Sequence, residues 1–329
     1  MARVVVRRTR SGRAATRESP ARRLGRRFLG RLALLAGVLA LVFAAVDMLP
    51  GSAAKGVLGA NATDDAVHAK NLELGLDRAW PIRFLRWLGG LLSGDMGTSI
   101  RGRRVGELVA AALPETMILV GAAVLVAVPC SVALGAWWAT SAGRRARRSA
   151  DALTTTAIAV PEFVIATMLV VLFALLLDAL PAATIVTADG SIAAPDMRVL
   201  PALALVIPQI GWNGRVVHAA VADHVGDPHV TQAILDGVPP RRVLLHHVLP
   251  MALPTIAASA ATSTGMLVGG AVVVETAFNH PGIGNLLSSA VAAKDSVTAA
   301  AIVAVVGILI ACVLTASDAV RVAVTGRAA

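Results

Sequence analysis

The chain has 329 residues, of which 56% are hydrophobic and 15% are charged, and its mean hydropathy is +0.73. This composition excludes an ordinary soluble enzyme and predicts a protein that crosses a membrane several times. The net charge of +10 does not indicate nucleic-acid binding, because residues 1–30 hold ten arginines against one acid and so carry +9 of that charge.

Residues 1–30 are predicted to form a disordered basic tail. The apolar run that follows, Leu32–Leu49, is longer than the core of a usual signal peptide, and no convincing cleavage site follows it. We therefore expect it to be the first membrane span. Arginines directly before a span favour the cytoplasmic side, beside anionic lipid, so the N-terminus is predicted to be cytoplasmic.

Residues 31–112 are predicted to comprise this first span and a long extracytoplasmic loop. Within the loop, aromatic and aliphatic residues between Trp80 and Leu88 alternate with Arg83 and Arg86. This pattern is amphipathic and too polar to cross a bilayer. We expect helices that lie on the outer surface of the membrane.

Five further apolar runs are each close to the roughly 20 residues that a helix needs to cross about 30 Å of hydrocarbon. They define a core over residues 113–322, and they are Met117–Trp138, Ala157–Leu180, Val199–Val221, Leu253–Val274 and Val297–Ser317. Arginines gather between the second and third runs and between the fourth and fifth, whereas the loops between the other core runs hold one basic residue each. The pattern predicts six spans with the C-terminal residues 323–329 in the cytoplasm.

The third run contains Pro161, Glu162 and Phe163. A carboxylate inside a membrane is costly unless it faces protein, water or a partner, and proline can kink a helix and open a polar pocket. These residues are predicted to line a translocation path. The alternative is that Glu162 lies near the cytoplasmic end and reaches interfacial water.

The fourth run contains Gln209, Trp212 and Asn213. Gln209 and Asn213 share one helix face, with Trp212 beside them, which provides hydrogen bonds and a flat apolar wall for a polar solute. We expect these residues on the same path. The alternative is that the two amides form hydrogen bonds between helices.

Residues 222–250 form a polar, basic, proline-broken segment between the fourth and fifth runs. Val230, Ala233, Ile234 and Val238 predict a short helix, which Gly237 ends. A proline turn and a second, basic helix then follow. The segment is either a rigid cytoplasmic structure that a partner grips or a solvated loop, and its candidate coupling residues are Ala233, Gly237, Pro239, Pro240, Arg241, Arg242, Leu249 and Pro250.

Residues 275–284 close the fifth run on the outside. One proline and two glycines predict a tight turn that can re-enter the mouth of a pore, where a gate would act. The alternative is an ordinary external turn. The candidate gate residues are Glu275, Phe278, Pro281, Gly282 and Gly284.

The sequence lacks the phosphate-binding loop that ATP hydrolysis requires. Such a loop ends in Gly-Lys, whereas each of the three lysines, Lys55, Lys70 and Lys294, follows an alanine. The histidines near the basic segment and the two cysteines show no spacing typical of a metal site or a disulfide framework. We therefore predict no catalytic residue, metal or cofactor in this chain.

Several stretches resemble one known family. The spacing from Gly237 to Leu249-Pro250 is similar to half of the "EAA" loop of binding-protein-dependent ABC importers, although Thr231, Gln232 and Ala233 stand at the Glu-Ala-Ala positions. The stretch VPPRRVLLHHVLPMALP resembles the dipeptide, oligopeptide and nickel permease branch. Leu-Pro-Gly at 49–51 and the 275–284 turn resemble the same branch.

The resemblance implies an all-α membrane subunit with the type I ABC importer permease fold, in a bacterial inner membrane. It implies a heterodimer with a related permease, two cytoplasmic ATPases that bind ATP and magnesium, and an external solute-binding protein. The implied cargo is di- or oligopeptides, with nickel or a metal chelate as the alternative. An ion-coupled secondary transporter would need acids on several spans and inverted repeats, which the sequence does not show, and a membrane sensor would need a signalling domain.

Overall fold

A computed structural model describes residues 20–59, 61–140, 143–188 and 190–325, and this part of the chain is mostly helical. The all-α class predicted from the sequence is confirmed. The first helix, α1 (Pro20–Asp47), begins inside the stretch that was predicted to be a disordered tail, so residues 20–30 are helical. Proline is favoured in the first turn of a helix, where its missing N–H has no partner to lose. The rest of the predicted tail, residues 1–19, lies outside the described residues.

Four helical stretches of the described chain are long and apolar enough to cross a membrane. They are Leu24–Asp47 in α1, Val105–Thr140 (α5), Pro240–Ala277 and Ser296–Ala319 in α13 (Ser296–Thr325). A bent pair of helices makes a fifth candidate. The 27-residue helix α8 (Val199–Val225) occupies the place of the predicted fourth span, but it is less apolar because Gln209, Asn213 and Arg215 interrupt it.

The third predicted span, Ala157–Leu180, is not a straight helix. The chain forms α6 (Arg144–Ala159), breaks at Val160 and Pro161, and continues as α7 (Glu162–Leu169) and the π-helix η1 (Val170–Leu176) at an angle of 103°. Val160 is extended, as expected for a residue before proline, and Pro161 has no N–H to continue the ladder of α6. The arginine-rich linker after α5 thus becomes the first turns of α6.

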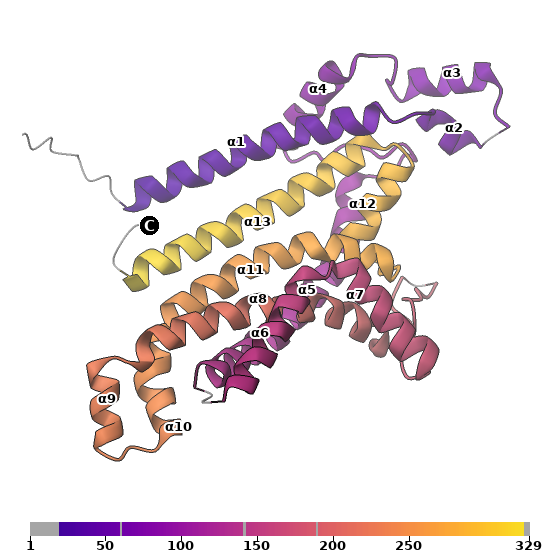
Figure 1. Cartoon of the computed structure of the whole chain (residues 1–329). Helices are drawn as coiled ribbons and strands as arrows, with labels where there is room; N and C mark the ends of the chain where they lie inside the picture. Colours follow the sequence, from indigo (N-terminus) through magenta and orange to yellow (C-terminus); the bar gives the residue numbers. More distant parts are fainter. Residues whose placement is uncertain (1–19, 60, 141–142, 189, 326–329) are drawn as a thin grey trace, which may run out of the picture.

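Helices α1 and α13 lie side by side along one flank of the bundle (Figure 1). Gly307 of α13 admits the side chain of Leu35, which a Cβ at this position would overlap. Near one end of the pair, Arg31 donates hydrogen bonds to Thr315 at 2.6 Å and to Asp318 at 2.9 Å. The two terminal helices are therefore joined by both apolar packing and a partly buried ion pair.

The loop after α1 contains three short helices, α2 (Ala53–Leu58), α3 (Asp64–Glu73) and α4 (Trp80–Leu92). Helix α4 is amphipathic, as its sequence predicts. Phe84 and Trp87 are buried against Phe43 of α1, with ring centroids 5.7 and 6.0 Å from that of Phe43. Ile82 and Leu85 are exposed. The structure thus attaches α4 to the end of the first span by aromatic packing.

Helices α5 and α8 cross closely because α5 has glycine at the contact. A Cβ at Gly135 would lie 2.6 Å from Cβ of Val217 and 2.7 Å from the carbonyl oxygen of Gly214, both on α8. Gly121, on the same helix, has nothing within 4 Å. Small residues at such contacts let two membrane helices approach closely enough for dense packing.

Gly135→Ala is therefore expected to destabilise the protein by about 1–3 kcal/mol, because α5 and α8 must separate to admit the methyl group. Gly121→Ala is expected to be neutral or slightly stabilising, since alanine favours the helix and meets no neighbour. Thermal unfolding of the two variants in detergent measures the difference. Equal midpoints would show that the close crossing does not contribute to stability.

The two ends of the helical bundle are formed by different helices. The start of α1, the end of α13 and the helices α9 (Pro228–Leu235) and α10 (Pro240–Val243) lie at one end, whereas α2, α3, α4 and α12 (Ile283–Ala292) lie at the other (Figure 1). The start of α1, the end of α13 and the segment 222–250, all predicted to lie on one side of the membrane, are thus at the same end of the bundle. Which side that end faces stays a prediction. We call the first the coupling end and the second the outer end.

Candidate functional site

The segment 222–250 is a helical hairpin at the coupling end of the bundle. Helix α9 ends at Leu235, and Gly237 follows with a φ of +78°, the left-handed conformation that glycine adopts without steric cost. The N–H groups of Gly237 and Val238 donate to the carbonyls of Ile234 and Ala233, each at 3.0 Å. The prediction that Gly237 ends this helix is confirmed.

The turn and second helix also form as the prolines predict. Pro239 is extended, and Pro240 begins α10, which continues through the π-helix η3 (Leu244–Val248) into α11 (Leu249–Ala277). Each proline occupies a position where it costs no helical hydrogen bond. Because α10, η3 and α11 are consecutive, the hairpin joins directly to a membrane span.

The inner face of the hairpin is packed against α8. Val230, Ala233, Val243 and Val248 are buried together with Val217, Val221 and Ala252, and Leu249 is partly buried against them. The described tip of the hairpin includes exposed Gly237, Pro239, Pro240, Arg241 and Arg242. Ile234 differs from the prediction, because it does not share the buried face and is 56% exposed. Together with exposed Leu235 and Leu245, it gives the hairpin an apolar outer surface.

A cavity of about 640 Å³ lies at the break between α6 and α7. It brings together five of the predicted path residues, Pro161, Glu162, Phe163, Gln209 and Trp212. The rest of its lining comes from the same break, from α8 and from the middle of α11, and comprises Ile158, Val160, Pro208, Met266, Gly269, Gly270 and Val273. We call this space the upper cavity.

Asn213 does not line the upper cavity. Its side chain is buried between helices, donates to Ser263 at 3.0 Å and accepts from Ser259 at 2.7 Å. For Asn213, the structure therefore agrees with the alternative of hydrogen bonding between helices. Gln209 is buried too, but its Oε1 has no hydrogen-bond partner among the described residues.

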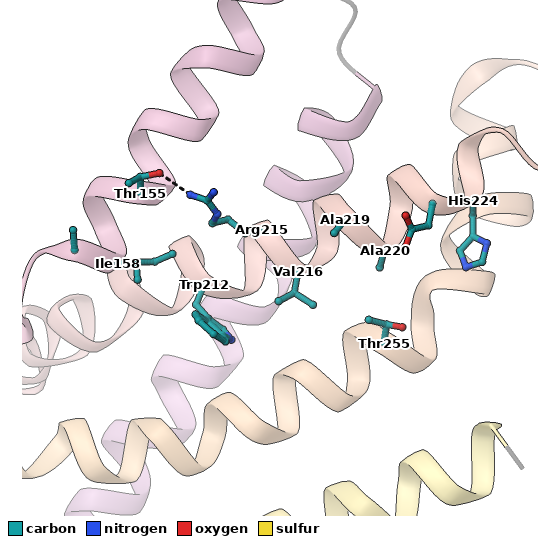
Figure 2. Close-up of a pocket in the computed structure, with 11 residues that line it drawn as sticks. Thr155, Ile158, Trp212, Arg215, Val216, Ala219, Ala220, His224 and Thr255 are labelled. Atoms are coloured by element: carbon teal, nitrogen blue, oxygen red, sulfur yellow. Dashed lines mark hydrogen bonds between the residues drawn. The ribbon is translucent and has the colours of Figure 1, made fainter. Parts of the chain in front are cut away.

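A second cavity of about 610 Å³ lies between the upper cavity and the coupling end, and we call it the lower cavity. Figure 2 shows Thr155 of α6 hydrogen-bonded to Arg215 of α8 at one end, and His224 and Thr255 at the other. Arg215 also pairs with Asp151 at 3.2 Å. Ile158 and Trp212 line both cavities, so the two spaces adjoin at these side chains.

The 275–284 turn at the junction of α11 and α12 is buried at Glu275, Phe278, His280, Gly282 and Gly284, whereas Thr276, Ala277 and Asn279 are exposed. Phe278 is 1% exposed and belongs to the central core, and Glu275 is fully buried. The N–H of Gly284 donates to the Glu275 carboxylate at 2.6 Å. A Cβ at Gly282 would overlap that carboxylate, and one at Gly284 would overlap the backbone of Val272. Pro281 is partly buried. The gating role of the turn stays a prediction.

A polar cluster beside this turn was not found from the sequence. Arg198 donates to both oxygens of Glu115, at 2.9 and 3.0 Å, and the same carboxylate lies 3.7 Å from Nε2 of His280. Thr184 contacts the other ring nitrogen of His280 at 3.3 Å. These residues come from four separate parts of the chain, so no local pattern connects them.

A helix cap at the start of α13 was also missed, although the sequence contains a signal for it. Asp295 stands three residues before Thr298, and its carboxylate accepts hydrogen bonds from the N–H and the hydroxyl of Thr298.

His280 makes a pH dependence of stability testable. Burial lowers the pKa of His280 below its ordinary value of about 6.5, with Arg198 acting in the same direction and Glu115 opposing it. Above a pH of about 6.5, His280 is neutral in both the folded and the unfolded chain. At lower pH the unfolded chain binds a proton at His280 more readily than the folded chain does, so the free energy of unfolding falls. Thermal unfolding should show a smaller loss of stability between pH 8 and pH 5 in His280→Asn than in the wild type. An identical loss in both proteins would contradict this assignment.

The sequence matches one protein family model and relatives that have been named. Residues 131–328 match the family model described as "Binding-protein-dependent transport system inner membrane component". The chain is 28% identical over 272 residues to a probable peptide ABC transporter permease of Sinorhizobium fredii, which covers 82% of this chain and 87% of that protein. It is 31% identical over 271 residues to the glutathione transport system permease protein GsiC of Salmonella typhimurium, covering 82% and 86%.

A solved structure of the MetNI methionine ABC transporter in an inward-facing conformation has a similar fold. The match has a TM-score of 0.50 at 16% identity and covers 67% of this chain and 94% of that one. At this identity the likeness concerns the fold alone. The family model and the relatives together show that the chain belongs to the binding-protein-dependent transport system inner membrane components and is an ABC transporter permease.

Proposed function

We propose that the chain is one of two homologous permease subunits of an ATP-driven importer that carries short peptides into a bacterial cell. The relatives named above support this cargo, since one is called a peptide permease and the other a glutathione permease. The similarity extends over about four fifths of the chain. An external solute-binding protein would deliver the peptide to the outer end of the bundle.

The energy source in this proposal is a pair of separate ATPases. This chain has no Gly-Lys phosphate loop, so nucleotide and magnesium would be bound by the partners. The helical hairpin 222–250 is the observation that carries the proposal. It is anchored by buried valines, and its tip presents exposed prolines, arginines and apolar residues that suit a protein partner.

The hairpin is connected to the proposed path by a continuous stretch of helix. From Pro240 the chain runs through α10, η3 and α11, whose middle lines the upper cavity and whose last turns hold Glu275. A movement imposed on α10 by the ATPases would therefore displace the wall of the cavity. Such rigid-body coupling is a common way to switch a transporter between inward-facing and outward-facing states.

The second permease would complete the path. Phe163 and Trp212 line the upper cavity but are 55% and 44% exposed, which supports a partner that covers this face. The coupling end, with the start of α1 and the end of α13, would lie in the cytoplasm, and α2 to α4 would lie at the outer surface of the inner membrane. The arginine distribution supports this orientation.

Purification of the tagged protein in mild detergent, followed by identification of the co-purifying chains, tests the composition of the complex. The proposal expects a second homologous permease and ATPases with a phosphate loop. The external binding protein can then be screened for binding of peptides, nickel and metal chelates. Recovery of this chain alone, under conditions in which it is folded and active in uptake, would contradict the proposed assembly.

A further inference from the structure

The upper cavity contains two polar groups that accept hydrogen bonds and have no partner to donate them. The Glu162 carboxylate makes no hydrogen bond or ion pair with any residue in the described part of the chain. The Gln209 side chain is 5% exposed, and its Oε1 is likewise without a partner there. A buried acceptor such as Gln209 Oε1 is costly when unpaired, and the unpaired Glu162 carboxylate on the wall of the same cavity is partly buried. Together they indicate a missing donor.

The lining supplies no positive charge to offset the carboxylate. The other lining residues are apolar or glycine, apart from the indole of Trp212. The nearest cation on α8, Arg215, lines the lower cavity, where it already pairs with Asp151 and Thr155. A carboxylate in such surroundings attracts a cation, and the attraction is stronger than in water.

Helix α11 leaves space for this carboxylate. A Cβ at Gly270 would lie 2.5 Å from Oε1 and 2.6 Å from Oε2 of Glu162, so only glycine allows the observed position. The adjacent Gly269 also lines the cavity but has nothing within 4 Å. Alanine at position 270 would therefore displace the Glu162 carboxylate, whereas alanine at position 269 would not. The two glycines are a matched pair of positions for mutagenesis.

We propose that Glu162 and Gln209 form a subsite for a primary ammonium group of the transported solute. An ammonium carries three donors and one positive charge, and the subsite offers three acceptor oxygens and one negative charge. If the proposed function is correct, the group is the free amino terminus of a peptide. The preference of the cavity for a cation does not depend on that function.

The preference can be measured without transport. In the assembled complex, with Cys130→Ala and Cys312→Ala, Val273→Cys places a thiol on the cavity wall. The thiol is reacted with the aminoethyl and sulfonatoethyl methanethiosulfonates, which differ in charge, and its labelling is followed by mass spectrometry. The ratio of the two rate constants reports the local preference for the ammonium compound.

Glu162→Gln is expected to lower this ratio about tenfold, which corresponds to about 1.4 kcal/mol. Gly270→Ala should lower it in the same direction, because the methyl group displaces the carboxylate. Gly269→Ala should leave it within about twofold, and so should Asp178→Asn, which removes an exposed carboxylate outside the cavity. An unchanged ratio in Glu162→Gln would overturn the subsite, including the case in which a partner subunit already neutralises the carboxylate.

A parallel assay separates this inference from the proposed function. The wild-type complex and Glu162→Gln are reconstituted with the binding protein, and ATP-driven uptake of trialanine is measured. Loss of uptake in the variant together with a lowered ratio supports both proposals. Absence of trialanine uptake by the wild type argues against the peptide cargo, whereas the labelling ratio still decides whether the cavity prefers an ammonium group.

Discussion

Replacing Gly237 with proline is expected to abolish solute uptake while leaving the amount of membrane-inserted protein unchanged. Proline fixes φ near −65°, whereas Gly237 has a φ of +78°, and proline also lacks the N–H that donates to Ile234. The connection between α9 and α10 would lose its geometry, although the spans themselves would remain. Deletion of residues 239–242 should have the same effect, because it removes the exposed tip.

Gly226→Ala is the control for this change. Gly226 lies in the same hairpin, before α9, but has a φ of −90° and nothing within 4 Å of an added Cβ. Alanine fits there without strain, so uptake and co-purification of the ATPases should equal those of the wild type. Uptake at the wild-type level in Gly237→Pro would refute the coupling role of the hairpin.

Gly284→Ala is expected to prevent normal folding of the outer end. The new Cβ would overlap the backbone of Val272 on α11, and backbone atoms cannot rotate away as a side chain can. Helix α12 must then move off α11, which also breaks the hydrogen bond from Gly284 to Glu275. Overpacking of this kind costs about 1–3 kcal/mol and occasionally more, and the lost bond to a buried carboxylate adds to it.

The thermal unfolding midpoint and the fraction of monodisperse protein in detergent measure this loss. Gly269→Ala serves as the control, since it adds the same methyl group to α11 where nothing lies within 4 Å. Its midpoint should be at or above that of the wild type. If Gly284→Ala unfolds at the same temperature as Gly269→Ala, the tight contact between α11 and α12 does not determine the stability of the turn.

The sequence predicted best those features that depend on neighbouring residues. Gly237 and the two prolines that follow it determine the local backbone, so the hairpin has the form they predict. The apolar runs likewise become helices. The break at Pro161 was expected only as a kink within one span, because hydropathy records how apolar a segment is and not the direction in which it runs.

Features that depend on which helices meet were harder to predict. Gln209 and Asn213 have the spacing of one helix face, yet Asn213 bonds to α11 while Gln209 lines the upper cavity. The ion pair of Glu115 with Arg198 and its proximity to His280 join residues that are distant in the chain. The sequence suggested a gate for the 275–284 turn, but the burial of Glu275 and Phe278 within it could be known only once α11 and α12 were placed together.

The energy source of uptake tests the central claim most directly. The purified complex is reconstituted in proteoliposomes with the external binding protein, and uptake of a peptide that it binds is measured with ATP on the side of the hairpin 222–250. We predict uptake that requires hydrolysable ATP and persists when a protonophore removes the proton gradient. Uptake by this chain alone, without ATP and abolished by the protonophore, would contradict the account and favour an ion-coupled transporter.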